Sequence, residues 1–321
     1  MDQLEDVTMR QVKPHILFNS DLDSPDEWRE ALLLQLDEFE FSVASEVKNP
    51  FLVNIALLWN IPDCGLDRFV NLRAILSLGA GVNQLDLKRL PPGVPLARLV
   101  DTSLTRTMVD YAKTAAYRYH RRFHTYERLS RLSEWRFSRP TQTCDTTIAI
   151  LGLGELGREI ALALAREGFK VLGWSRTPKE LVDVTTYVGP GALTELVGAC
   201  DILINVLPLT DDTQQILCRS LFGHCRTGTC LINMGRGSHL VEADLLDALD
   251  ARIIGDATLD VSSIEPLPSN HPFWNHPSIL ITPHVAGIST PKTAAKTVAA
   301  NIIRAMAGER LLCQVDFARG Y

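Results

Sequence analysis

Short apolar runs alternate with stretches of helical periodicity along the chain. In the first hundred residues, the runs at 15–18, 54–59 and 74–78 predict strands, and apolar residues between 28 and 36 recur at helical spacing. This β-α-β alternation predicts a parallel sheet covered by helices.

A second alternation begins at residue 147, after a long helical pattern at 105–136. Helical stretches at 155–166 and 242–249 separate some of its strands, and the tail at 290–307 is helical again. We therefore predict an α/β protein with two domains. The strands expected in the second domain lie at 147–151, 170–174, 202–207, 230–234, 254–261 and 279–282.

The composition is that of an ordinary globular protein. Of the 321 residues, 46% are hydrophobic and 22% are charged, which argues against general disorder. The uncharged apolar stretch 49–62 is too short to span a bilayer, and the first residues are acidic where a signal peptide is basic. The seven cysteines are scattered and never spaced as Cys-x-x-Cys, so we expect reduced thiols in a cytoplasmic protein that does not enter a membrane.

One segment is basic although the net charge is −6. Residues 118–139 hold seven arginines against two glutamates, with aromatic residues between them. The pattern fits a nucleic-acid surface or an arm that packs on a second subunit. Because nothing else in the chain is basic, we expect the arm, hence a homodimer and no nucleic-acid partner.

A glycine-rich turn follows the strand expected at 147–151 and opens the next helix. Gly152 makes the tight turn, Gly154 lets a pyrophosphate approach the backbone, and Gly157 allows helix and strand to pack closely. The helix N-terminus, at Glu155 and Leu156, offers N–H groups to phosphates. In this strand–turn–helix context the motif predicts a dinucleotide site.

The next strand ends without the acidic residue that holds the ribose of NAD. Trp174, Ser175, Arg176, Thr177 and Lys179 stand there instead. Two hydroxyls and two cations suit a 2′-phosphate by hydrogen bonding and charge. We therefore expect NADPH (NADP) to be preferred over NADH, against the alternative of a solvated basic loop.

Polar residues also stand where later strands end, the positions at which parallel sheets bind ligands. Arg236 can clamp a carboxylate, His284 can move a proton near neutral pH, and Glu265 can fix the histidine tautomer. Each residue alone also fits a surface role, and the sequence does not show that the three meet.

The order of these motifs resembles the D-isomer-specific 2-hydroxyacid dehydrogenase family. The resemblance rests on the glycine-rich turn, Asn233-x-x-Arg236-Gly237, Asp260-Val261 with Glu265-Pro266, and Pro283-His284-Val285-Ala286-Gly287, and covers nearly the whole chain. Trp174–Thr177 and the closing Gln314–Asp316 and Ala318–Tyr321 are most similar to the glyoxylate/hydroxypyruvate reductase A branch. Asn83 departs from the family, where many members have Asp.

The resemblance implies roles for the catalytic residues. Arg236 would bind the substrate carboxylate and polarise the keto oxygen, His284 would be the acid/base, and Glu265 would keep His284 protonated. The remaining cofactor contacts implied are Asp260 beside the nicotinamide carboxamide, the Leu207-Pro208 loop under the cofactor, and Met234, Gly235 and Gly287.

On the substrate side, the resemblance implies a second carboxylate grip at Gly79, Ala80 and Gly81. Trp59 either caps a small substrate or belongs to the core. The family also splits its substrate domain, which would comprise 1–104 and 290–321, around a Rossmann-like NAD(P)-binding domain at 105–289 whose arm at about 105–140 forms the dimer.

The resemblance therefore implies NADPH-dependent reduction of small 2-oxoacids, glyoxylate to glycolate and hydroxypyruvate to D-glycerate. Two alternatives remain: an NAD-linked D-2-hydroxyacid dehydrogenase of another substrate, and a dinucleotide-sensing protein like the family's corepressors. A zinc enzyme is disfavoured, because His224, Cys225 and Cys230 lack paired ligand spacing, so we expect no metal.

Overall fold

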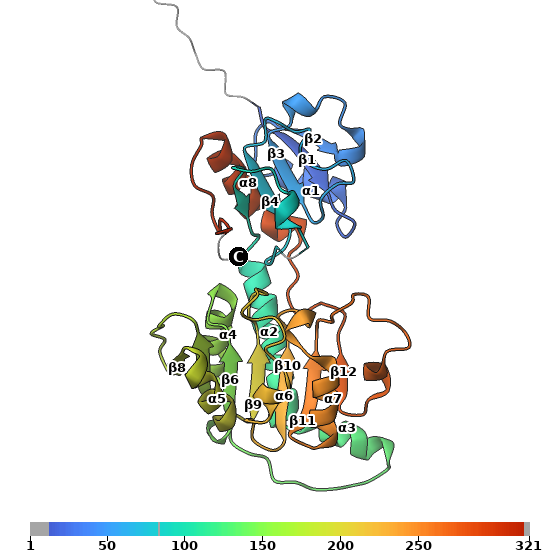
Figure 1. Ribbon diagram of the computed structural model, residues 1–321, viewed down its shortest axis with the longest axis vertical. Helices are drawn as coiled ribbons and strands as arrows, with labels where there is room; N and C mark the ends of the chain where they lie inside the picture. The colour runs from blue at the N-terminus through green and yellow to red at the C-terminus, as the bar shows by residue number, and fades with distance from the viewer. Residues whose placement is uncertain (1–12, 83, 318–321) are drawn as a thin grey trace, which may run out of the picture. The chain divides into compact units, whose positions relative to one another are not determined.

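The computed structural model describes residues 13–82 and 84–317, which form two compact units (Figure 1). The first unit is built from the chain up to Thr102 and from Ser289 onward, and the second is the continuous segment Ser103–Ile288. Asn83, the acidic start of the chain and the closing 318–321 motif lie outside the described residues.

The first unit is a parallel sheet of five strands in the order β2-β1-β3-β4-β5. Its helices α1 (Pro25–Leu33) and α8 (Pro291–Met306) come from opposite ends of the chain and pack on the same core. The strands are β1 (His15–Asn19), β2 (Glu40–Val43), β3 (Ile55–Leu58), β4 (Ala74–Ser77) and β5 (Leu96–Ala97).

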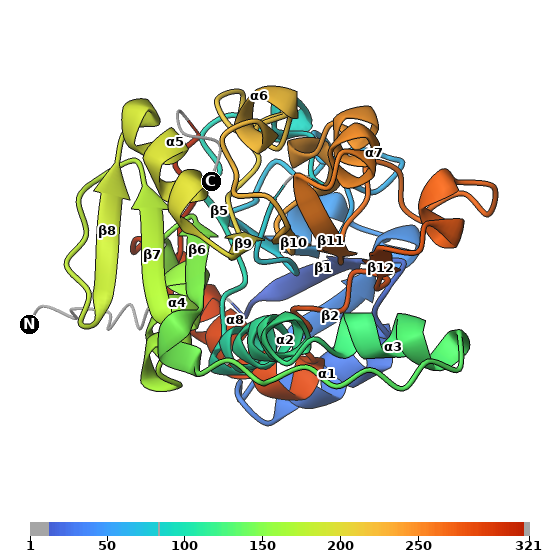
Figure 2. The same cartoon turned by 90° about the horizontal axis from the view of Figure 1, so that it is seen from below.

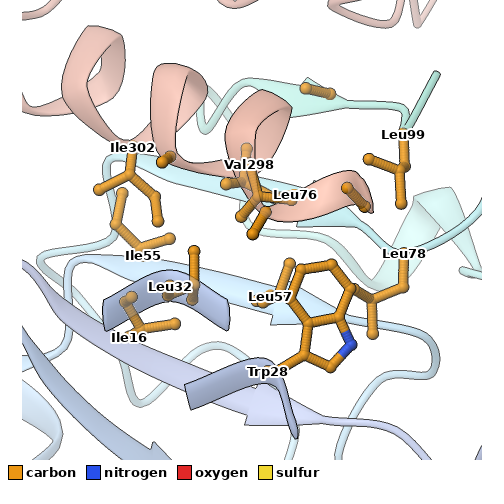
Figure 3. Packing of buried hydrophobic residues seen from close by; sticks show 14 of the residues in the cluster. Ile16, Trp28, Leu32, Ile55, Leu57, Leu76, Leu78, Leu99, Val298 and Ile302 are labelled. Carbon is orange, nitrogen blue, oxygen red and sulfur yellow. The ribbon is translucent and has the colours of Figure 1, made fainter. Parts of the chain in front are cut away.

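Alternation along the strands divides the core of this unit into two layers. Ile55 and Leu57 of β3 point toward the helices, where they meet Trp28 of α1 and Val298 of α8 (Figure 3). Ala56 and Leu58, the alternate residues, pack with apolar side chains from the loops on the other face of the sheet. Because both faces are covered, the strands read as continuous apolar runs.

The second unit is a parallel sheet of seven strands in the order β12-β11-β10-β9-β6-β7-β8 (Figure 2). Consecutive strands are joined by crossovers, so all carboxyl ends lie at one edge. The strands are β6 (Thr147–Leu151), β7 (Lys170–Ser175), β8 (Val184–Val188), β9 (Ile202–Asn205), β10 (Thr229–Asn233), β11 (Ile254–Leu259) and β12 (Ile279–Ile281).

Helices cover both faces of this sheet. On one face, α2 (Thr102–His120) and α4 (Glu155–Arg166) share a core with the isoleucines of β6 and β9. On the other face lie α5 (Pro190–Ala199), α6 (Arg219–Phe222) and α7 (Glu242–Asp250) (Figure 2). The short α3 (Phe123–Arg131) follows α2 and has no buried residue.

The α/β architecture with two parallel sheets flanked by helices confirms the predicted fold class. The long helical pattern at 105–136 forms two helices and not one: Arg122 takes the left-handed conformation, with φ of 59°, and divides the segment into α2 and α3. A left-handed residue cannot continue a right-handed helix, and neither Gly nor Pro marks the break. The strands β2, β5 and β8 and the helices α5 and α6 were not predicted.

Candidate active site

The predicted cofactor and catalytic segments of the second unit follow the carboxyl ends of its strands. The central strand β6 pairs with β7 on one side and with β9 on the other, so the strand order reverses there although all strands run parallel. Such a reversal opens a crevice at the edge of a parallel sheet, where ligands bind. The glycine-rich turn lies directly at this point, between Leu151 and α4.

The glycine-rich turn has the shape that a dinucleotide phosphate requires. Gly152 adopts φ of 103°, which favours glycine, and a Cβ on Gly157 would stand 1.8 Å from the Gly152 carbonyl oxygen. A Cβ on Gly154 would meet no atom within 4 Å, so the space before the first turn of α4 is open. The residues present therefore fit a phosphate group at the helix N-terminus.

The loop after β7 divides its side chains between the fold and the surface. The Trp174 indole N–H donates to the Gly189 carbonyl at 2.8 Å, and the buried Ser175 hydroxyl donates to the Thr177 carbonyl at 2.7 Å. Trp174 and Ser175 therefore shape the loop, whereas Arg176 and Lys179 are exposed.

The loops after β9 and β10 approach the glycine-rich turn and one another. A Cβ on Gly152 would meet the Leu207 nitrogen at 3.2 Å, which places the Leu207-Pro208 loop against the turn. In the next loop, a Cβ on Gly235 would stand 2.9 Å from the Asn205 amide nitrogen. Met234 is buried, and its N–H donates to the Asn205 carbonyl at 3.1 Å.

The structure brings Glu265 and His284 together. The Glu265 Oε2 atom lies 2.7 Å from His284 Nδ1, and the Ser262 N–H donates to Oε1 at 3.0 Å. Because a carboxylate only accepts, Nδ1 carries the hydrogen, which leaves Nε2 as the nitrogen that can exchange a proton with a ligand. Both side chains are partly exposed within this unit.

Charge and burial act in opposite directions at this site. Burial alone raises the pKa of Glu265, but hydrogen bonds from His284 and Ser262 and the charges of His284 and Arg236 outweigh it, so the pKa lies below its usual value. Burial lowers the pKa of the Arg236 guanidinium, and the Glu265 charge opposes that shift. The guanidinium stays charged at neutral pH, so Arg236 is a partly buried cation whose charge acts on Glu265.

Arg236 is held at the end of β10 by its own loop. Its Nη1 atom donates to the Gly235 carbonyl at 2.7 Å, and its carbonyl accepts from the Asn233 amide at 3.3 Å. Its N–H donates to Nδ1 of His239 at 3.1 Å. The side chain therefore stands on a loop whose backbone is fixed by buried polar groups.

The carboxylate of Asp260 fixes the loop that carries His284. Oδ1 accepts from the Thr282 hydroxyl at 2.6 Å and from the Val285 N–H at 2.9 Å, and Oδ2 accepts from the Ala286 N–H at 2.9 Å. His284 itself has φ of 56°, and its N–H donates to the Asp260 carbonyl at 2.8 Å. Asp260 is thus a loop anchor, in addition to the carboxamide contact implied by resemblance.

Two residues of helix α2 support the same loop, and no motif in the sequence pointed to either of them. The Tyr111 hydroxyl lies 2.6 Å from Oγ1 of Thr282, and since Thr282 donates to Asp260, Tyr111 is the donor. Burial raises the pKa of Tyr111 to about 12. A Cβ on Gly287 would stand 2.7 Å from the Met108 sulfur, so the loop packs closely against α2 at this glycine.

The predicted substrate grip lies in the first unit. Gly79, Ala80 and Gly81 follow β4 in a tight turn, where a Cβ on Gly79 would stand 2.9 Å from the Gly81 oxygen. The Trp59 ring is 3.1 Å from the same Cβ position and packs against the apolar core. Trp59 thus touches both the core and the glycine turn.

Within the described part of the chain, no helix is both long and apolar enough to cross a bilayer. The same residues contain no group of three His, Cys, Asp or Glu side chains placed to hold a metal ion. None of the seven cysteines, all of which lie within the described residues, forms a disulfide.

Comparison with known proteins identifies the family. Residues 114–286 match the family model described as D-isomer specific 2-hydroxyacid dehydrogenase, NAD binding domain. A glyoxylate/hydroxypyruvate reductase A from Serratia proteamaculans (strain 568) is 40% identical over 96% of this chain and 100% of its own length.

Two solved structures share the fold over 96% of this chain and all of their own. One is a D-isomer specific 2-hydroxyacid dehydrogenase from Xanthobacter autotrophicus Py2 in complex with NADPH and MES, with TM-score 0.92 and 37% identity. The other is an NADPH-dependent glyoxylate/hydroxypyruvate reductase from Sinorhizobium meliloti in complex with NADP and sulfate, with TM-score 0.88 and 35% identity. The family model, the full-length identity and the shared fold agree, and the chain belongs to the D-isomer specific 2-hydroxyacid dehydrogenase family.

Proposed function

We propose that this protein reduces small 2-oxoacids, glyoxylate to glycolate and hydroxypyruvate to D-glycerate, with NADPH. The observation that carries the proposal is the Glu265–His284 pair, joined at 2.7 Å, with the partly buried Arg236 cation acting on Glu265. Relatives that bear the name glyoxylate/hydroxypyruvate reductase support the substrate class.

In the proposed reaction, the reduced nicotinamide group supplies the hydride when it is bound. Arg236 pairs with the substrate carboxylate and meets the negative charge that grows on the keto oxygen. His284 gives the proton from Nε2 to that oxygen, which becomes the hydroxyl of the product. Glu265 accepts the Nδ1–H of His284 and thereby favours the protonated ring that reduction requires.

The dinucleotide would be held by the second unit. The turn at Gly152, Gly154 and Gly157 and the first turn of α4 would take the pyrophosphate, and the Leu207-Pro208, Met234-Gly235 and Gly287 segments would line the nicotinamide end. The first unit would supply substrate contacts through Gly79, Ala80 and Gly81, with Trp59 beside them. This assigns the cofactor contacts to the second unit, which also carries Arg236 and His284.

The preference for NADPH over NADH is part of the proposal. The loop after β7 has no acidic residue to hold a ribose 2′-OH, and it exposes Arg176, Thr177 and Lys179. Two cations and a hydroxyl suit a 2′-phosphate. Family structures that contain NADPH or NADP support the same preference.

The arm that follows α2 supports a homodimer. It exposes large apolar side chains, among them Phe123, Leu132, Phe137 and a fully exposed Trp135. Light scattering after size exclusion would give twice the chain mass of 35.6 kDa. The cytoplasmic location stays a prediction from the cysteines.

The decisive experiment follows nicotinamide absorbance with glyoxylate, then hydroxypyruvate, using NADPH and then NADH. Fast oxidation of NADPH and slow oxidation of NADH are expected. The His284→Ala variant should bind NADPH normally and lose turnover. Preference for NADH would overturn the assignment of the Arg176 loop, and normal turnover by the variant would overturn the mechanism.

A further inference from the structure

A histidine that the proposed mechanism does not use lies between the loops after β9 and β10. The His239 residue is fully buried, with no exposed surface. Its Nδ1 atom accepts the Arg236 N–H at 3.1 Å and lies 2.9 Å from the Asn205 side-chain amide nitrogen. Its Nε2 atom lies 3.2 Å from the Pro208 carbonyl oxygen.

These contacts define the tautomer of the ring. The Pro208 carbonyl can only accept, so Nε2 carries the hydrogen and donates it. Nδ1 is then an acceptor, as the Arg236 N–H requires. Burial, aided by the Arg236 charge, lowers the pKa of His239 to about 4, so the ring is neutral near pH 7 and keeps both interactions.

The ring belongs to a buried polar network that reaches both loops. The Asn205 amide also donates to Asn233 Oδ1 at 2.9 Å, and its oxygen accepts the Leu207 N–H at 3.3 Å. Asn233 Oδ1 in turn accepts the Gly235 N–H at 3.3 Å. Both asparagines have no exposed surface, so the network is closed to water.

We propose that His239 is a positioning residue that joins the backbone of Arg236, on one side of its ring, to the Pro208 loop on the other. The inference rests on the proposed function, in which Arg236 holds the substrate carboxylate and the Leu207-Pro208 loop supports the cofactor. One rigid ring then fixes the distance between the Arg236 backbone and the Leu207-Pro208 loop. A misplacement of Arg236 lowers the reaction rate, because hydride transfer depends on how the substrate is aligned with the cofactor.

Two substitutions separate the two sides of the ring. In His239→Asn, the side-chain oxygen can replace Nδ1 as the acceptor, and the donor to Pro208 is lost. In His239→Gln, the longer amide can replace the Nε2–H donor, and the acceptor for the Arg236 N–H is lost. Each variant removes one contact and retains the other.

The two variants should differ in what they weaken. His239→Gln should raise KM for glyoxylate about tenfold and lower kcat, with the Kd for NADPH within about twofold of wild type. His239→Asn should raise the Kd for NADPH about tenfold and change KM for glyoxylate less. The Kd is measured by NADPH fluorescence titration without glyoxylate, and thermal melts report the stability of each variant.

The control is His120→Gln. His120 is also buried, and its ring forms a hydrogen bond with Thr146. Thr146 precedes β6, so this contact lies at the amino ends of the strands, away from the loops that follow their carboxyl ends. This control should lower Tm and should not change KM for glyoxylate and Kd for NADPH by different factors. Equal changes in KM and Kd in both His239 variants, or kinetics equal to wild type, would overturn the inference. If wild type fails to reduce glyoxylate and hydroxypyruvate, the proposed function fails, and the Kd difference still tests the NADPH side of the ring.

Discussion

An added methyl group at two glycines of the same turn should have two different effects: at Gly157 it should lower stability, and at Gly154 it should weaken cofactor binding. In the structure, Gly157 is enclosed by protein and Gly154 faces open space. Replacing each by alanine separates the part of the motif that holds the fold from the part that admits the cofactor.

The cost at Gly157 follows from its distances. The new Cβ would stand 1.8 Å from the Gly152 carbonyl oxygen and 2.9 Å from Val206 Cγ2, and contacts under 3.0 Å force a shift. The oxygen belongs to the backbone, so α4 must move away from the turn by about 1 Å. We expect Gly157→Ala to lower the free energy of unfolding by about 3 kcal/mol, the upper part of the range for overpacked sites.

The cost at Gly154 is of another kind. Its φ of −71° suits any residue, and a Cβ there meets no protein atom within 4 Å. The small loss of N-cap preference is offset by the lower entropy of the unfolded chain, so stability should stay within about 1 kcal/mol of wild type. The methyl group would stand where the pyrophosphate approaches, so the Kd for NADPH should rise at least ~10-fold.

Urea unfolding without cofactor tests the predicted loss of stability, and fluorescence titration with NADPH tests the predicted loss of cofactor binding. A Gly157→Ala protein that unfolds like wild type would refute the packing argument. A Gly154→Ala protein that binds NADPH like wild type would refute the assignment of the open space to the pyrophosphate.

Three further outcomes are expected. Glu265→Gln should lower kcat and move the basic limb of the pH–rate profile for reduction to lower pH by about one unit, since no carboxylate then favours protonated His284; an unchanged profile contradicts this. Arg128→Met should lower the free energy of unfolding, measured with urea, by about 2 kcal/mol. The substitution removes the guanidinium that lies 2.6 Å from the buried Asp256 carboxylate. The pKa of His239 is about 4 in the folded protein and 6.5 in the unfolded chain. Between these two pH values only the unfolded chain binds the proton, which favours unfolding. The free energy of unfolding of wild type should therefore fall by about 3 kcal/mol as the pH falls from 6.5 to 4. The same series on His239→Asn should show a smaller decline.

The sequence predicted the central strands well because each is covered on both faces. A strand such as β6 reads as an unbroken apolar run, and its expected limits, 147–151, agree with the structure. The edge strand β8 alternates half-buried and exposed residues, and β5 has only two residues, so neither has a comparable pattern. The break at Arg122 was missed because helical periodicity continues across it.

The contact between Glu265 and His284 could be expected only by resemblance, because nothing in a linear sequence shows that two loops meet. The anchoring role of Asp260 depends on where the backbone N–H groups of 285 and 286 point, which composition and spacing do not reveal. His239 had a weak signal: a histidine three residues after Arg236, before an apolar pair. That spacing becomes informative only once the loop is known to fold back on its own backbone.

The division of the first unit between the two chain ends has a consequence for synthesis on the ribosome. Residues 103–288 leave the ribosome as one uninterrupted segment, so the second unit can fold while the chain is still growing. The core of the first unit needs Val298 and Ile302 of α8, which are made only after the whole second unit. Until then the apolar side chains of β3 and β4 lack that cover, and the nascent chain is most exposed to aggregation and to chaperone binding during this interval.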